Sequence, residues 1–82
     1  MEIIVKHLNG RTFSIQTESS CNIEKIKEEI YKKEHILPEH QCIVWTGTFP
    51  YKELVDSDTL IDNNIQNEST LNLVMRLPGS LI

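Results

Sequence analysis

The chain has 82 residues, with 12 acidic against 8 basic side chains, a formal net charge of -4 and two cysteines. This length provides one domain with one hydrophobic core, and the acidic balance argues against nucleic acid or a membrane surface as partner, because phosphate binding requires clustered lysine and arginine. Two cysteines are too few for a disulfide framework, so we expect a reducing location in the cytoplasm, the nucleus or both.

The first elements in the chain form a predicted β-hairpin. Met1 to His7 alternates apolar and polar residues, and Arg11 to Thr17 alternates again. Asn9-Gly10 lies between them, and this dipeptide is the one best suited to the positive φ angles of a tight hairpin turn. The two segments are therefore expected to pair as antiparallel strands.

A helix is predicted after the hairpin. Asn22 is a favourable N-cap, and Glu24 lies in the first turn, where a negative charge stabilises the helix dipole. The helix should end near Glu34, because Pro38 prevents the residue before it from remaining helical. One apolar stripe recurs at spacings of three and four residues: Ile23, Ile26 and Ile30.

The remaining chain supplies two more strands, at Gln41 to Trp45 and at Thr70 to Arg76. The order strand, strand, helix, strand, short elements, strand predicts a single-domain α+β fold of the β-grasp type, a mixed sheet with one helix packed across it. The predicted core consists of Ile3, Val5, Phe13, Ile15, Ile23, Ile26, Ile30, Ile43, Leu54, Leu60, Ile65, Leu71 and Leu73.

Three stretches closely resemble the ubiquitin family: Met1 to Lys6, Lys33 to Pro38 and Asn64 to Leu77. The resemblance spans roughly residues 1–79, and it implies a ubiquitin-like domain at 1–77 followed by a tail or linker at 78–82. In the family a glycine usually ends the helix where His35 stands here, so histidine in that backbone geometry is expected to cost about 1 kcal/mol.

The C-terminal positions depart from the family. Ubiquitin ends in Arg-Leu-Arg-Gly-Gly, and the carboxylate of that glycine pair is activated and joined to lysines. The matching positions here are Arg76 to Ser80, with proline, glycine and serine as the last three. We therefore predict a non-catalytic ubiquitin-like interaction domain that is not itself conjugated. The alternative is a divergent modifier that is processed and conjugated to target lysines; a third possibility is a scaffold with a private partner.

The resemblance also implies an apolar docking face. Leu8, Val44 and Val74 match the patch through which ubiquitin meets most of its receptors, which predicts a monomer that binds ubiquitin-binding proteins or proteasome receptor subunits. Asn72 replaces a histidine of that patch, and Cys42 replaces one of two arginines that engage the activating enzyme. The residues predicted to contact partners are Leu8, Val44, Trp45, Asn72, Val74 and Arg76.

An apparent insertion, Thr48 to Tyr51, follows the third strand and carries aromatic residues. Trp45, Phe49 and Tyr51 are the residue types that dominate protein interfaces, so this loop could enlarge the docking face. The alternative interpretation is that Trp45 and Phe49 pack against each other and order the loop.

Four lysines match, or are aligned with, family lysines that carry further modifiers. They are possible ubiquitination or chain-building sites: Lys6, Lys27, Lys33 and Lys52. Lys27 matches a largely buried family lysine that pairs with an aspartate, here Asp56, so a structural role is the stronger interpretation.

Catalysis and metal binding have little support in the sequence. The three histidines are scattered, and no serine or cysteine has a base at a recognisable spacing. His40 and Cys42 form an isolated pair, whereas structural zinc needs four ligands. We expect no enzymatic activity, no metal and no cofactor.

Overall fold

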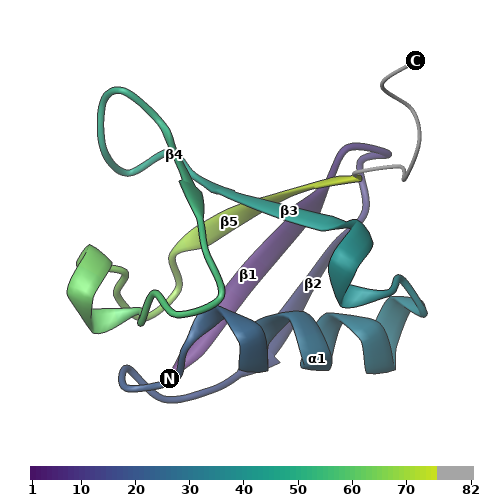
Figure 1. Cartoon of the computed structure of the whole chain (residues 1–82), viewed down its shortest axis with the longest axis horizontal. Helices are drawn as coiled ribbons and strands as arrows, with labels where there is room; N and C mark the ends of the chain where they lie inside the picture. The colour runs from purple at the N-terminus through teal and green to yellow at the C-terminus, as the bar shows by residue number, and fades with distance from the viewer. Residues whose placement is uncertain (76–82) are drawn as a thin grey trace.

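A computed structural model describes residues 1–75 and shows one sheet packed on one helix (Figure 1). The strands are β1 (Glu2–His7), β2 (Thr12–Gln16), β3 (Gln41–Trp45), β4 (Lys52–Leu54) and β5 (Thr70–Met75). The helices are α1 (Ile23–Glu34) and two short 3-10 turns, η1 (Pro38–His40) and η2 (Ile61–Asn63). The predicted α+β architecture is therefore confirmed.

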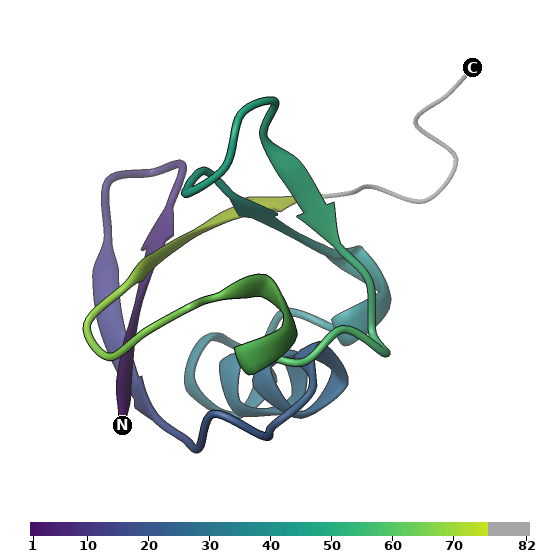
Figure 2. The same cartoon turned by 90° about the vertical axis from the view of Figure 1, so that its left-hand side faces the viewer.

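The five strands lie in the order β2-β1-β5-β3-β4. The central strand β5 runs parallel to its neighbour β1, and the other neighbouring strands run antiparallel, so the sheet is mixed as predicted. Seen along α1, the sheet curves over the helix, and η2 closes one open end of the layer between them (Figure 2).

The hairpin between β1 and β2 turns at Asn9-Gly10 as predicted, although only Gly10 of the two has a positive φ angle. Gly10 has a φ angle of 92°, a conformation that L side chains rarely adopt. The Asn9 side chain accepts a hydrogen bond of 2.9 Å from the backbone N–H of Arg11, which fixes the turn locally. The turn and its register place Ile3 opposite Ile15 on the buried face of the hairpin.

Helix α1 begins and ends where the sequence indicates. The Asn22 side chain accepts a hydrogen bond of 3.0 Å from the backbone N–H of Lys25, as an N-cap should. His35 is the C-cap, with a φ angle of 60° in the left-handed region, and its N–H donates to the carbonyl of Tyr31. The helix thus ends in the left-handed geometry that the resemblance implies, although histidine stands in place of the glycine that favours it.

The hydrophobic core contains every predicted residue except Phe13. Phe13 packs against the core but remains partly exposed, because β2 is an edge strand and is covered on one side only. One buried polar residue was not predicted: Gln41 is only 2% exposed. Its Nε2 donates to the carbonyls of Lys27 (3.0 Å) and Ile36 (2.8 Å), which joins α1 to β3, whereas its buried Oε1 has no partner among residues 1–75.

Candidate functional site

The outer face of the sheet lies opposite α1 and carries most of the predicted contact residues (Figures 1 and 2). The register aligns Val44 of β3 with Asn72 of β5, and Asn72 in turn with Lys6 of β1. Val74 pairs with Cys42 one step further along. Because side chains alternate along a strand, these residues share the face that the core does not use.

Exposure differs across this face. Leu8, which follows β1, is 73% exposed, whereas Val44, Asn72 and Val74 are half-buried beside their neighbours. Leu8 therefore protrudes from the outer face, and the less exposed Val44 of β3 and Val74 of β5 form an apolar area beside it. Such an area is what a partner helix or strand buries on docking.

Trp45 lies on the other side of β3 and does not share the outer face. Its ring packs against the core cluster and covers Gly47 so closely that an added Cβ there would lie 2.1 Å from the ring atom Cζ2. The buried indole Nε1 has no hydrogen-bond partner among residues 1–75. Partner binding by Trp45 stays a prediction. A partner would have to reach a ring that is partly buried against the core cluster.

The inserted loop presents the exposed aromatic side chains instead. Phe49 is 93% exposed and meets Tyr51 edge to face, with ring centroids 6.2 Å apart. The predicted alternative of a Trp45–Phe49 contact is therefore wrong: Phe49 pairs with a loop neighbour, because the loop turns away from the helix side where Trp45 packs (Figures 1 and 2).

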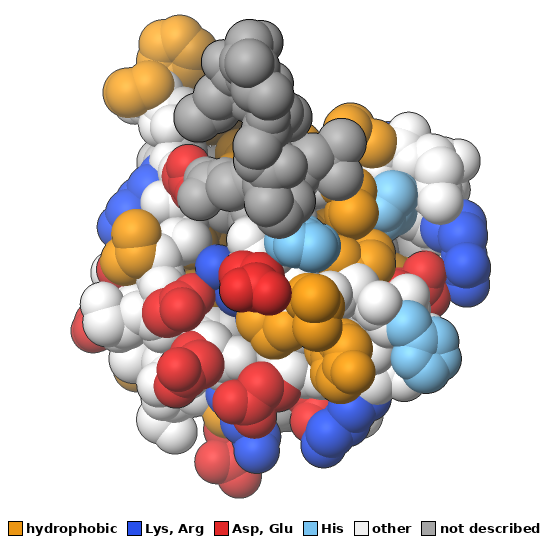
Figure 3. Space-filling model, turned by 45° about the vertical axis from the view of Figure 1, so that its right-hand side comes forward, with side chains coloured by type: hydrophobic (Ala, Val, Ile, Leu, Met, Phe, Trp, Pro, Cys, Tyr) orange, Lys and Arg blue, Asp and Glu red, His pale blue; other side chains and the backbone are white. Residues whose placement is uncertain are grey.

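A second exposed apolar area was missed from the sequence. Tyr31 and Leu37, near the end of α1, are exposed, and Tyr31 meets His35 edge to face at 6.5 Å. Figure 3 shows hydrophobic side chains gathered between histidines and acidic groups on the side toward which α1 ends. Tyr31 lies outside the isoleucine stripe of α1, and that position was the available signal.

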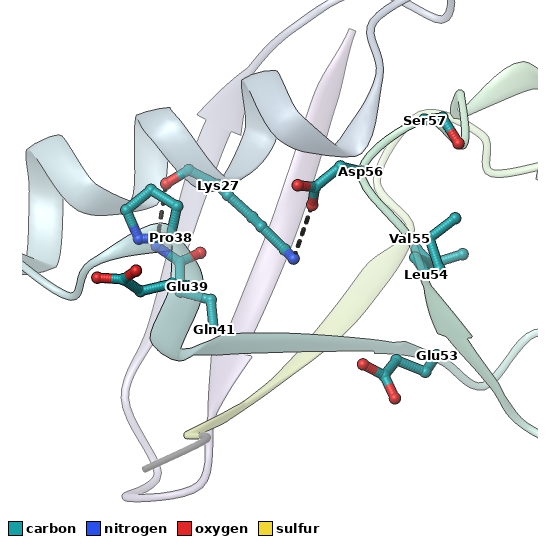
Figure 4. Close-up of a pocket in the computed structure, with 9 residues that line it drawn as sticks. All are labelled: Lys27, Pro38, Glu39, Gln41, Glu53, Leu54, Val55, Asp56 and Ser57. Carbon is teal, nitrogen blue, oxygen red and sulfur yellow. Dashed lines mark hydrogen bonds and ion pairs between the residues drawn. The ribbon is translucent and has the colours of Figure 1, made fainter. Parts of the chain in front are cut away.

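An open cleft of about 830 Å³ lies between α1 with η1 and the segment after β4 (Figure 4). The Lys27 ammonium reaches across it and forms an ion pair of 2.8 Å with Asp56, which confirms the predicted pairing. The Lys27 side chain is 13% exposed and that of Asp56 is 59% exposed, so the ammonium is largely covered while the carboxylate faces solvent.

The four candidate lysines have unlike surroundings. Lys6 and Lys33 are exposed, and Lys27 is held by Asp56. The Lys52 ammonium donates to Asn63 Oδ1 at 2.7 Å and lies 3.7 Å from Asp58. This contact between β4 and η2 could not be predicted from local patterns, because it joins residues of two separate elements.

The remaining features are the C-terminal residues, potential metal ligands and helices that could cross a membrane. Arg76 and the predicted boundary between residues 77 and 78 lie outside the described residues. Within residues 1–75, no group of three or more potential metal ligands occurs, and no helix has the length and apolarity to cross a membrane.

One helix packs against a mixed sheet, and Leu8, Val44 and Val74 lie on the outer face of that sheet. This arrangement agrees with what a comparison of the sequence with known protein families finds. The sequence profile of the ubiquitin family matches residues 3–78. The chain belongs to the ubiquitin family. Members of this family are generally not enzymes.

Three relatives differ in the share of their own length that this chain matches. The NEDD8-like protein RUB3 of Arabidopsis thaliana is 44% identical over 96% of both chains. The ubiquitin-like protein NEDD8 of Dictyostelium discoideum is 33% identical over 99% of this chain and 100% of its own length. The probable ubiquitin receptor RAD23 of Oryza sativa subsp. japonica is 34% identical over 93% of this chain, but over only 19% of its own length.

These relatives overturn the predicted function of a domain that is not conjugated. NEDD8-like proteins are modifiers that become conjugated, and they match this chain over almost their whole length. The prediction gave Pro78 and Ser80 more weight than the similarity of the remaining chain.

Proposed function

We propose that this chain is a ubiquitin-like modifier that is processed at its C-terminal end and conjugated to lysines of target proteins. The observation that supports this proposal most strongly is the match to NEDD8-like proteins over 96% to 100% of their length. The fold supports the proposal, because it presents an intact outer sheet face while β5 ends at Met75 and leads directly into the tail.

The chemistry requires a free glycine carboxylate. Hydrolysis of the Gly79–Ser80 peptide bond would provide one, and four residues would separate it from β5. Such a segment reaches at most about 14 Å when extended. The carboxylate would attack ATP to form an acyl adenylate with release of pyrophosphate. A cysteine thiolate would then displace AMP, and a target amine would finally displace the thiolate to form the isopeptide bond.

The test uses chains that end at chosen positions. A chain that ends at Gly79 is incubated with ATP and an activating enzyme for NEDD8-like proteins, and reductant-sensitive adducts are measured on gels. We expect a thioester with this chain and none with the 82-residue chain in the absence of a processing protease. Gly79→Ala in the truncated chain is the matched control, and it should lower the rate of charging, because a methyl group stands next to the reacting carboxylate.

A further variant separates the fold from the tail. A chain with Ser80→Gly that ends at residue 80 restores the family's glycine pair. If this variant forms the thioester while the chain that ends at Gly79 does not, the fold is competent but its own tail is not, and the proposal is wrong.

We also propose that proteins of the ubiquitin pathway, including ubiquitin-binding proteins or proteasome receptor subunits, recognise the modifier through Leu8, Val44 and Val74. The exposed Leu8 and the half-buried Val44 of β3 and Val74 of β5 support this assignment. Titration with a ubiquitin-binding helix should shift the amide resonances of Val44 and Val74. Unchanged resonances at saturating helix would contradict it.

A further inference from the structure

The cleft between α1 with η1 and the segment after β4 has an acidic lining (Figure 4). Three carboxylates and one ammonium group line it, those of Glu39, Glu53, Asp56 and Lys27. The ammonium group already pairs with Asp56 at 2.8 Å, so negative charge is in excess along the cleft. A surface of this kind attracts a cationic group of a partner and repels an anionic one.

A buried acceptor in the same lining has no donor. Gln41 lines the cleft and is only 2% exposed. Its Nε2 donates to the carbonyls of Lys27 and Ile36, so Oε1, on the other branch of the planar amide, points away from those carbonyls and toward the side where the Lys27 ammonium lies (Figure 4). This Oε1 accepts no hydrogen bond within residues 1–75, although a buried amide oxygen normally has a donor.

Lys27 can donate to either of two acceptors in this cleft. Its ammonium group has three N–H donors, and its side chain lines the same cleft as Gln41 and Asp56. If another cation takes Asp56, the ammonium group needs a new acceptor, because a largely covered charge without a partner is costly. Gln41 Oε1 provides that acceptor. The cleft can therefore take up a second cation and still satisfy Lys27.

A guanidinium group is the cation that competes best for Asp56. The Asp56 side chain is 59% exposed, so an incoming group can reach its carboxylate from solvent. A guanidinium group binds a carboxylate through two parallel hydrogen bonds, whereas an ammonium group acts as a point charge. A second ammonium group thus has no advantage over that of Lys27, but a guanidinium group does. Pro38 and Val55 also line the cleft, and they offer apolar surface to the stem of an arginine.

The exposed apolar area beside the cleft indicates a protein as the source of the guanidinium group. Leu37 is 42% exposed and directly precedes Pro38 of the lining. Tyr31 is 43% exposed and lies four positions after Lys27 on α1, which is about one helical turn. A small guanidinium compound would leave both side chains in water, whereas a polypeptide with an apolar residue beside its arginine buries them.

We propose that this cleft binds an arginine side chain of a partner protein. The guanidinium group pairs with Asp56, and the ammonium group of Lys27 moves to Gln41 Oε1. An apolar side chain next to that arginine covers Leu37. The site is formed by α1, η1 and the segment after β4 and needs no C-terminal processing, so it goes beyond the proposed function.

The probe is the peptide acetyl-Leu-Arg-Leu-amide, which is titrated into the isotope-labelled 82-residue chain. Binding is followed by the NMR resonances of the Asp56 backbone amide and of the Gln41 side-chain amide. Two matched peptides replace arginine by citrulline, which has nearly the same shape without the charge, or by lysine. We expect the arginine peptide to bind about threefold to tenfold more tightly than either, as for a charged contact that water partly screens. Only the arginine peptide should shift the Gln41 side-chain resonances, because Oε1 then gains a donor.

Variants of the chain test the assignment of the site. Asp56→Asn should abolish the preference for the arginine peptide over the citrulline peptide. Because that variant also loses stability, Glu39→Gln gives a second test. It removes an exposed carboxylate of the lining that forms no ion pair within residues 1–75, and it should weaken the arginine peptide about twofold. Asp62→Asn removes an exposed carboxylate of η2 outside the lining, and as the control for net charge it should leave the affinity unchanged.

Several results would overturn the proposal. The arginine peptide does not bind in the millimolar range, or the citrulline peptide binds as tightly. Resonance changes at Val44 and Val74 without changes at Gln41 would place the peptide on the outer sheet face instead. Acetyl-arginine-amide that binds as tightly as the peptide would indicate a small guanidinium compound and no protein partner. None of these measurements uses the chain's own C-terminal carboxylate, so failure of conjugation would not affect them.

Discussion

The Lys27–Asp56 pair should show an asymmetry between its two partners. The ammonium and the carboxylate are 2.8 Å apart, but Lys27 is 13% exposed and Asp56 is 59% exposed. Asp56→Asn therefore leaves a positive charge that water reaches poorly, whereas Lys27→Met leaves a carboxylate that water hydrates readily. Methionine also retains much of the apolar stem of the lysine.

The size of the expected change in the free energy of unfolding follows from the distance between the two charges and from how strongly water screens their attraction. Two unit charges at this distance attract by about 1.5 kcal/mol in bulk water and by roughly 6 kcal/mol at an effective dielectric constant of 20. The exposed carboxylate places the pair near the lower value. We expect Asp56→Asn to lower the free energy of unfolding by about 2 kcal/mol, Lys27→Met by about 0.5 kcal/mol and the double variant by about 1 kcal/mol, a coupling of about 1.5 kcal/mol.

Urea unfolding followed by the fluorescence of Trp45, the single tryptophan, measures these values. Asp62→Asn is the control for loss of a surface carboxylate and should change the free energy of unfolding by less than about 0.5 kcal/mol. The reasoning is refuted if Lys27→Met costs as much as Asp56→Asn, or if the coupling is indistinguishable from zero.

Three further substitutions test local features of the fold in the same unfolding assay. His35→Gly relieves the left-handed backbone at φ 60° but loses the contact with Tyr31, so we expect a stabilisation of at most about 1 kcal/mol; a clear destabilisation would show that the ring contact outweighs the strain. Gly47→Ala forces the Trp45 ring to move and should cost about 1–3 kcal/mol with an altered emission spectrum, and an unchanged spectrum would argue against the close approach. Asn22→Ala removes the N-cap and should cost about 1 kcal/mol, whereas Asn22→Ser should recover most of it.

Local sequence patterns predicted helix α1 and four of the five strands with their buried faces, whereas the short strand β4 was not predicted. The Asn9-Gly10 turn, the N-cap at Asn22 and the isoleucine stripe of α1 depend on neighbouring residues only, and each occurs as predicted. The tail residues misled the functional prediction, which the match to NEDD8-like proteins over almost their whole length overturns.

Contacts between distant segments were decided by the tertiary structure. The sequence determined which side of each strand is apolar, because side chains alternate along a strand whatever its partner. Only the folded chain brings η2 beside β4, so that Asn63 holds Lys52, and only the fold places the carbonyls of Lys27 and Ile36 where Gln41 can donate to both. Hydrogen bonds of this kind depend on distances between elements, and periodicity within one element does not encode those distances.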